Sequence, residues 1–391
     1  MPLTLQRDRF FWTIALQTFV VNFFIGGFGP AQSLLQADQK TTLVVAGLHG
    51  TSMGIASIVA GFVNPWMTHK YGRTNTGWIG LNVFSIGLLA VATVPSVVLT
   101  ISATFITGFG ISTVINASVT LLNSRYGAKA PLALTQANGI ASIGYVSGTL
   151  LIGTIAEFAP NYWRIALIAV LPLAAYLYFI RREKVTEPHL PSEEGRHGGK
   201  LPLLFWITWI GFIASISTEF ATAFWASSLV EERTGTSAAI STIAIAALAT
   251  GMGVGRLFGG KVLHRLSLDN QLLTIFGLQM TGFFGLWFSH TLIYSLAMLL
   301  LSGIGISMQF ALTALRLISH SQGRADLAIG KSSLGAGIAI AGAPFLLAVL
   351  ASEFHISRAY LMVPVLILLA AAIVKFVPAK VDQQILDDLQ L

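Results

Sequence analysis

The chain has 391 residues, of which 54% are hydrophobic and only 10% are charged, whereas soluble proteins average about 25% charged residues. A water-soluble globule needs a polar surface, so this composition excludes that class and favours a surface that faces lipid. The net charge of +7 comes from basic residues between apolar runs. The sequence has no block of basic residues interleaved with aromatic residues, which would indicate nucleic-acid binding. Without cysteine, the chain offers no disulfide framework and no cysteine-based metal or redox site.

Apolar stretches of about 20 residues, long enough to cross a bilayer as helices, recur along the whole chain. In the first half we predict spans at 10–34, 42–66, 75–94, 97–122, 131–157 and 163–181. The polar stretch "RREKVTEPHLPSEEGRHGGK" follows, and further spans are predicted at 202–229, 237–262, 270–289, 291–317, 327–352 and 357–377. The sequence therefore predicts an all-α membrane protein with twelve transmembrane helices, the first of them retained rather than removed as a signal peptide.

Twelve spans place both termini on one side of the membrane, and the distribution of basic residues predicts which side. Nineteen of the 23 Lys and Arg residues fall on the side of the termini and the central loop; the other side has Lys40, Arg164, Arg233 and Arg358. Because cytoplasmic loops carry an excess of Lys and Arg, we expect both termini to be cytoplasmic.

The two halves of the chain repeat each other. "KAPLAL" at 129–134 matches "RADLAI" at 324–329, and "THKYGR" at 68–73 matches "LHRLSL" at 263–268, both at an offset of 195. "AEF" at 156–158 matches "SEF" at 352–354 at an offset of 196. We therefore predict two pseudo-symmetric six-helix bundles, at 1–182 and 202–391, joined by a cytoplasmic linker at 183–201.

This organisation resembles the major facilitator superfamily, whose loop between the second and third helices reads G-x-x-x-D-R-x-G-R-R/K. In "PWMTHKYGRT", Lys70, Gly72 and Arg73 fit the pattern, and His69 replaces the acid. In "GKVLHRLSLD", Arg265 fits and His264 again replaces the acid. The resemblance implies gating roles for His69, Lys70, Gly72, Arg73, Arg256, His264 and Arg265, with a latch that is weaker or pH-dependent because histidine stands where the acid is usual.

Two narrower likenesses concern single helices. Glu219, Trp225 and "GMGVGRLFGG" at 251–260 resemble the fucose-permease-like and related sugar-permease-like branch. "SIGYVSGTL" is similar to the fifth-helix motif of drug/proton antiporters, although Tyr145 and Thr149 depart from it.

The superfamily resemblance implies that the first, fourth, seventh and tenth spans line a central cavity, and each has a polar or small stripe at helical spacing. Small residues on such stripes also serve helix packing, which is the alternative for them. The candidates for solute binding are Asn22, Asn116, Gln309, Thr222, Trp225 and Asn138.

Glu219 is the one charged residue in "GFIASISTEFATAFWASS", about 25 Å along its span at 1.5 Å per residue. Ionisable groups inside a membrane are functional hypotheses by default, so we expect Glu219 to couple transport to protons, with His49 as a second candidate. The alternatives are a structural glutamate, neutral or paired with arginine, and a histidine that only packs.

Neither an enzyme motif nor a phosphate-binding loop is present, and no cofactor or metal is expected. The predicted function is secondary active transport of a small, neutral or weakly cationic polar solute across the cytoplasmic membrane by a monomer that alternates access, with proton-coupled uptake favoured. The alternatives are a proton-antiport exporter of drugs or amphipathic metabolites and, in another class, a non-transporting membrane receptor or scaffold.

Overall fold

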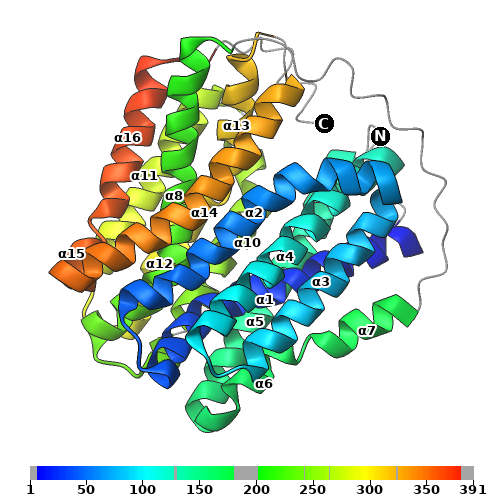
Figure 1. The fold of residues 1–391 in the computed structure, drawn as a ribbon. Helices are drawn as coiled ribbons and strands as arrows, with labels where there is room; N and C mark the ends of the chain where they lie inside the picture. Colours follow the sequence, from blue (N-terminus) through cyan, green and yellow to red (C-terminus); the bar gives the residue numbers. More distant parts are fainter. Residues whose placement is uncertain are drawn as a thin grey trace. The chain divides into compact units, whose positions relative to one another are not determined.

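The computed structural model describes residues 7–126, 130–179, 201–241, 243–263, 265–322 and 325–379, and the regular elements in these ranges are helices. They form two compact units, residues 1–190 and 191–391, and the division falls within the stretch predicted as the linker. The first unit contains α1 (Arg9–Gln39), α2 (Leu43–Tyr71), α3 (Arg73–Thr93), α4 (Val97–Tyr126), α5 (Ala130–Phe158), the 3₁₀ turn η2 (Pro160–Tyr162), α6 (Trp163–Ile168) and α7 (Leu171–Phe179) (Figure 1).

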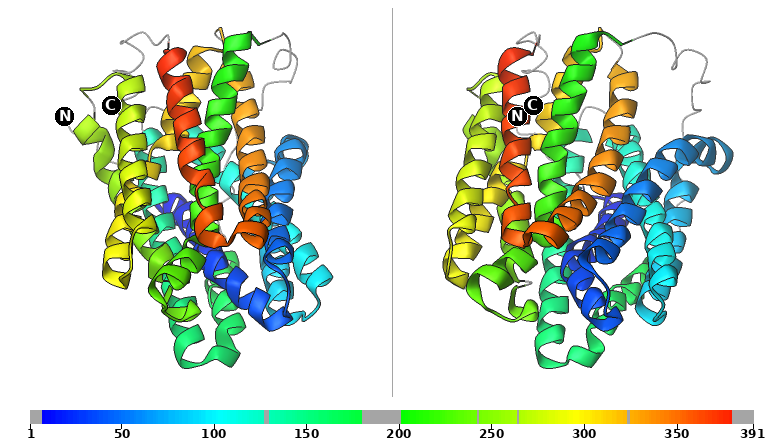
Figure 2. Two further views of the ribbon diagram at one scale, coloured as in Figure 1. Left: turned by 90° about the vertical axis from the view of Figure 1, so that its left-hand side faces the viewer. Right: turned by 60° about the vertical axis from the view of Figure 1, so that its left-hand side comes forward.

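In the second unit, too, the regular elements of the described residues are helices. It contains α8 (Leu203–Thr234), α9 (Ala238–Ser241), α10 (Ile243–Leu263), α11 (Leu268–Trp287), α12 (Leu292–Ile306), α13 (Gln309–Ser319), α14 (Ala325–Phe354), α15 (Ile356–Ala359) and α16 (Met362–Phe376). Figure 2 shows α8, α14 and α16 running side by side in both views, in green, orange and red, and α8 contacts both α14 and α16.

Eleven of the twelve predicted spans correspond to helices that are long and apolar enough to cross a membrane, counted over the described residues. The twelfth, predicted at 270–289, corresponds to α11, which forms a 20-residue helix but is less apolar. The reason is its content of Asn270, Gln271 and Gln279, two of which are buried inside the unit. An all-α fold with twelve membrane helices agrees with these observations.

The predicted repeat is present in the packing of the two units. A hydrophobic cluster in the first unit contains Phe10, Leu122 and Ala133, and one in the second contains Phe205, Leu317 and Ala328, each equivalent at the offset of 195. Three close glycine contacts repeat in the same way. Gly108 packs on Met53 as Gly303 packs on Leu248, Gly110 packs on Phe84 as Gly305 packs on Gln279, and Gly87 packs on Thr107 as Gly282 packs on Ser302. The two units therefore share one pattern of helix packing.

Asp8 fastens the start of α1 to the end of α4 within the first unit. As the N-cap of α1, its Oδ1 accepts hydrogen bonds from the Phe11 N–H at 2.9 Å and the Tyr126 hydroxyl at 2.7 Å, while Oδ2 accepts from Arg125 at 3.0 Å. Partial burial by itself raises the pKa of Asp8, but the Phe11 N–H, the Tyr126 hydroxyl and Arg125 together hold that pKa below its ordinary value of 3.8.

Replacing Gly110 should destabilise the first unit because a Cβ there would lie 2.3 Å from the Phe84 backbone nitrogen. We expect Gly110→Ala to lower the free energy of unfolding by about 1–3 kcal/mol or more, since overpacking against backbone has no easy relaxation. The control is Gly61→Ala in α2, where a Cβ meets nothing within 4 Å; it should leave stability unchanged or raise it by up to about 1 kcal/mol. Thermal unfolding of both variants in detergent tests this, and equal melting temperatures would contradict it.

The Asp8 contacts predict a pH-dependent contribution to stability. Because the folded pKa is lowered, the contribution is present in full above the ordinary pKa of 3.8 and is lost as the pH falls through the folded value. Asp8→Ala should cost about 1 kcal/mol at neutral pH through the lost cap, while Asp8→Asn keeps the cap and loses only the charge pairing. Melting curves from neutral pH to below 3.8 should therefore bring Asp8→Asn and the native chain together. Coincidence of the two at neutral pH would disprove the contribution.

Candidate functional site

Glu219 lies near the middle of α8, in a 32-residue helix whose surrounding residues are almost all buried. Its own side chain is partly buried. Among the residues that the structure describes, no hydrogen bond to its carboxyl group is found, but the positive charge of Arg256 on α10 is near enough to attract it. Arg256 also donates from Nε to the Ser307 carbonyl at 3.4 Å. Glu219 therefore has Arg256 as an electrostatic partner, and its carboxyl is not part of the hydrogen bonds found among the described residues.

Beside Glu219, a closed ring of hydrogen bonds joins α8, α11 and α13. Ser215 Oγ donates to Gln309 Oε1 at 2.7 Å, and Gln309 Nε2 donates to Gln279 Oε1 at 2.6 Å. Gln279 Nε2 donates to Thr218 Oγ1 at 2.9 Å, and Thr218 Oγ1 donates to the Ser215 carbonyl at 2.7 Å. All four side chains are fully buried. We call Ser215, Thr218, Gln279 and Gln309 the polar layer.

The first unit provides an internal control for the polar layer. At the offset of 195, the equivalents of its members Ser215, Thr218, Gln279 and Gln309 are the buried apolar residues Val20, Phe23, Phe84 and Val114. The equivalent of Glu219 is Phe24, which packs edge-on against Phe84 with ring centroids 6.0 Å apart. The same packing scheme is therefore built with an apolar layer in one unit and a polar layer in the other.

Since the fold does not require these polar groups, their presence points to function. A buried hydrogen bond contributes only about 0.5–1.5 kcal/mol net, and replacing both partners by apolar groups of similar shape is often neutral or stabilising. The apolar layer of the first unit shows that such a replacement is compatible with these helices. The polar layer and Glu219 are accordingly the strongest candidate for the functional site within the second unit.

The sequence predicts part of this site. Gln309 and Glu219 are among the predicted residues, but Gln279 is not, because it lies outside the four spans that the superfamily resemblance places around a cavity. The signal that points to Gln279 is the repeat itself, since the equivalent residue at the offset of 195 is the apolar Phe84. Gln309 was expected to face a cavity, and the structure places it fully buried as the first residue of α13.

Thr222 and Trp225 follow Glu219 on α8 and are both buried. Thr222 Oγ1 donates to the Thr218 carbonyl at 2.7 Å. The Trp225 indole N–H donates to the Pro344 carbonyl in α14 at 3.0 Å. The polar groups of both side chains are therefore used within the second unit in this structure.

The candidates of the first unit lie on separate helices. Asn22 on α1 is partly buried and donates to the Thr18 carbonyl at 2.8 Å; Asn116 on α4 and Asn138 on α5 are exposed. His49 on α2 is buried, with Nδ1 3.2 Å from the Ala46 carbonyl and Nε2 2.9 Å from the Thr100 hydroxyl. Both ring nitrogens of His49 are hydrogen-bonded inside the unit, which favours the packing alternative for this residue.

Comparison with known proteins identifies the family. The family model described as Major Facilitator Superfamily matches residues 14–325. The chain belongs to the major facilitator superfamily. No curated protein sequence matches it.

Solved structures agree with the superfamily fold. A mutant of the nucleoside transporter NupG superposes with a TM-score of 0.76 at 12% identity, over 94% of this chain and 99% of that one. A D-xylose–proton symporter has a TM-score of 0.72 at 15% identity, over 95% and 98%. A variant of the E. coli fucose:proton symporter FucP has a TM-score of 0.60 at 15% identity, over 94% and 98%. Because it belongs to the major facilitator superfamily, the chain is a multi-pass membrane transporter of the secondary class rather than an enzyme.

The superfamily loop motif lies at the junction of α2 and α3. Gly72 separates the two helices with φ 80°, a conformation that favours glycine, and Arg73 begins α3. Lys70 is exposed and lies 5.0 Å from the centre of the Trp66 ring. The His69 side chain and the whole of His264 lie outside the described residues, while Arg265 is exposed after α10.

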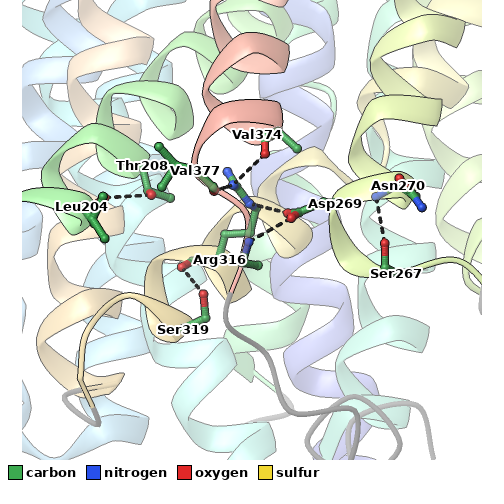
Figure 3. A network of polar contacts seen from close by, with 10 residues as sticks. Leu204, Thr208, Ser267, Asp269, Asn270, Arg316, Ser319, Val374 and Val377 are labelled. Atoms are coloured by element: carbon green, nitrogen blue, oxygen red, sulfur yellow. Dashed lines mark hydrogen bonds and ion pairs between the residues drawn. The ribbon is translucent and has the colours of Figure 1, made fainter.

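A buried ion pair lies at the end of α13 opposite to Gln309. Arg316 Nε donates to Asp269 Oδ1 at 2.8 Å, and Asp269 Oδ2 accepts the Ala379 N–H at 2.8 Å. Arg316 also donates to the Val377 and Val374 carbonyls, so it holds the segment after α16 against α11 and α13 (Figure 3). α13 is therefore held by polar contacts at both ends.

No group of three potential metal ligands occurs in the described parts of the chain.

Truncating Arg316 should be costly, since it would leave the Asp269 carboxylate partly buried without its cation. We expect Arg316→Met to lower the free energy of unfolding by about 3 kcal/mol, the lower end for breaking a buried pair because Asp269 keeps 20% exposure. The matched control is Arg125→Met, whose pair with Asp8 is exposed at 49% and 36% and should contribute under about 1 kcal/mol. Thermal unfolding of both variants tests this, and equal losses would contradict it.

Proposed function

We propose that the chain carries a small, neutral or weakly cationic polar solute across the cytoplasmic membrane by alternating access, coupled to protons through Glu219. The observation that supports this most strongly is the contrast between the two units. Glu219 and the polar layer occupy positions that are apolar in the first unit, although both units share the same packing. An acid placed where the fold accepts phenylalanine is best explained by its chemistry.

The chemistry required of a proton carrier fits Glu219. It must gain and lose a proton as access alternates, so the carboxyl must be within reach of solvent in at least one state and must not be locked in a tight ion pair. Glu219 is partly buried, and the charge of Arg256 attracts its carboxyl without an ion pair between them among the described contacts. We assign the proton to Glu219 rather than to His49, because His49 has both nitrogens in hydrogen bonds.

The nature of the solute is inferred from the charges near Glu219. In the described part of the second unit, Arg256 is the basic residue whose charge acts on Glu219, which disfavours a multiply anionic solute. Neutral hydroxylated solutes fit amide, hydroxyl and carboxyl groups. Among the similar structures are a nucleoside transporter, a D-xylose–proton symporter and a fucose:proton symporter. Asn22, Asn116 and Asn138 remain our candidates for solute contact in the first unit.

We propose uptake, in a plasma or inner membrane, with both termini on the cytoplasmic side as the distribution of Lys and Arg predicts. Export of an amphipathic compound by proton antiport is the second candidate. It is supported by the aromatic residues of α8, where Trp206 and Trp209 stack edge-on with ring centroids 5.5 Å apart. The two directions are distinguished by the side on which the solute accumulates.

Glu219→Gln should abolish uphill transport while leaving exchange intact, because an amide binds solute but carries no proton. In proteoliposomes with a pH gradient of about one unit, a one-proton symporter accumulates solute about tenfold on the alkaline side, and the variant should reach a ratio of about one. The probes are labelled uridine, D-xylose and L-fucose, with a lipophilic dye to detect antiport toward the acidic side. Counterflow of the same probe should persist in the variant.

Glu353→Gln is the matched control, since Glu353 is an exposed carboxylate near the end of α14. It should behave as the native chain in both assays. Uphill accumulation that survives in Glu219→Gln would rule out this residue as the proton carrier, and accumulation without a pH gradient would rule out protons as the coupling ion.

A further inference from the structure

The fourth membrane span is a continuous helix in the first unit and an interrupted one in the second. In the first unit α4 is unbroken from Val97 to Tyr126. Its counterpart in the second unit divides at Ser307 and Met308 into α12 and α13. One neighbouring contact is nonetheless equivalent, because Gly305 packs on Gln279 as Gly110 packs on Phe84. This contact is compatible with a continuous helix, so the cause of the break is sought among the residues at which the two units differ.

The carbonyls at the break are satisfied by side chains instead of by the next turn of helix. In a continuous helix, the Gly305 carbonyl would accept the backbone N–H of Gln309. Here it accepts the Gln309 side chain, from Nε2 at 3.1 Å. The Ile304 carbonyl accepts Ser307 Oγ at 2.7 Å, and the Ser307 carbonyl accepts Arg256 Nε at 3.4 Å. The break therefore carries its own set of donors.

Two of these donors have no counterpart in the first unit. The residue equivalent to Gln309 is Val114, and the residue equivalent to Arg256 is Gly61. Neither has a side chain that donates a hydrogen bond. The unbroken helix occurs where the donors are absent, and the broken helix occurs where they are present.

Gln279 determines how Gln309 is oriented. Its Oε1 accepts from Gln309 Nε2 at 2.6 Å, while Ser215 Oγ donates to Gln309 Oε1 at 2.7 Å. In this orientation, Nε2 of Gln309 donates to both Gln279 Oε1 and the Gly305 carbonyl. The Phe84 of the first unit has no group that does this.

We propose that Gln309, oriented by Gln279, is a positioning residue that acts on Glu219 through the break between α12 and α13. By occupying the Gly305 carbonyl, its side chain keeps the two helices apart. The Ser307 carbonyl is then free to hold Arg256. Arg256 lies on α10, which packs against α8, the helix of Glu219, so its position affects the positive charge beside that carboxyl. Only the last step, the part of Glu219 in transport, rests on the proposed function.

Hydrogen exchange tests the first half of this proposal without a solute. In Gln309→Val and Gln279→Phe, which install the residues of the first unit, the backbone bonds across 305–312 should close and amide exchange there should slow by about tenfold. The control is Gln271→Val, a buried glutamine in α11 that donates to the Leu266 carbonyl at 2.9 Å; it should leave exchange in 305–312 unchanged. Unchanged or faster exchange in Gln309→Val overturns the proposal.

Infrared spectroscopy tests the second half. The carboxyl band of Glu219, assigned by its loss in Glu219→Gln, should shift in Arg256→Gln and shift in the same direction in Gln309→Val. In the double variant the two effects should not add, because both act through Arg256. A purely structural role for Gln309 predicts additive shifts or none, and either result overturns the proposal.

The outcomes separate this proposal from the proposed function. If uphill transport survives in Glu219→Gln while both spectroscopic results hold, protons are not carried by Glu219 but Gln309 still positions Arg256. If transport depends on Glu219 and the exchange rate at 305–312 does not respond to Gln309→Val, the proposed function stands and the positioning role falls.

Discussion

Buried amides in a membrane protein have no water to bond with, and the organisation of the second unit follows from satisfying them. Gln279 and Gln309 each have an amide with donors and an acceptor, and unpaired groups of this kind cost several kcal/mol in hydrocarbon. The ring through Ser215 and Thr218 pairs them. We propose that the same requirement explains the break between α12 and α13, since the side chain of Gln309, the first residue of α13, occupies the Gly305 carbonyl of α12.

The difference between the two repeated units bears on function. Two units that share the contacts of Gly110 with Phe84 and of Gly305 with Gln279 differ in the polarity of one layer. An apolar layer is the simpler solution in lipid, and the first unit has it. A polar layer that contributes little net stability points to a reason other than stability, and we propose that the acid beside it carries the coupled proton. Superfamily membership establishes the transporter class, while the solute and the coupling ion rest on the site.

Ion pairs at the ends of helices hold neighbouring helices together within each unit. In the first unit Asp8 joins the start of α1 to the end of α4. In the second unit Arg316 and Asp269 join α13 to α11 and to the segment after α16. The second pair is the more deeply buried, so α13 is held at its far end by charge and at its near end by the amides of the polar layer.

The sequence alone determined the class, the number of membrane helices and the repeat, and it predicted a role for Glu219, because hydropathy, the period of the repeat and a lone charge are local signals. It did not determine that Gln309 would be enclosed rather than exposed, or that Gln279 would be its partner. Those facts depend on which faces of α8, α11 and α13 meet, and residues 30 to 94 positions apart come into contact only when the helices pack. The break after Ile306 could not be predicted from the sequence either, because the side chains of Gln309 and Arg256 reach backbone carbonyls at the break only when the helices pack.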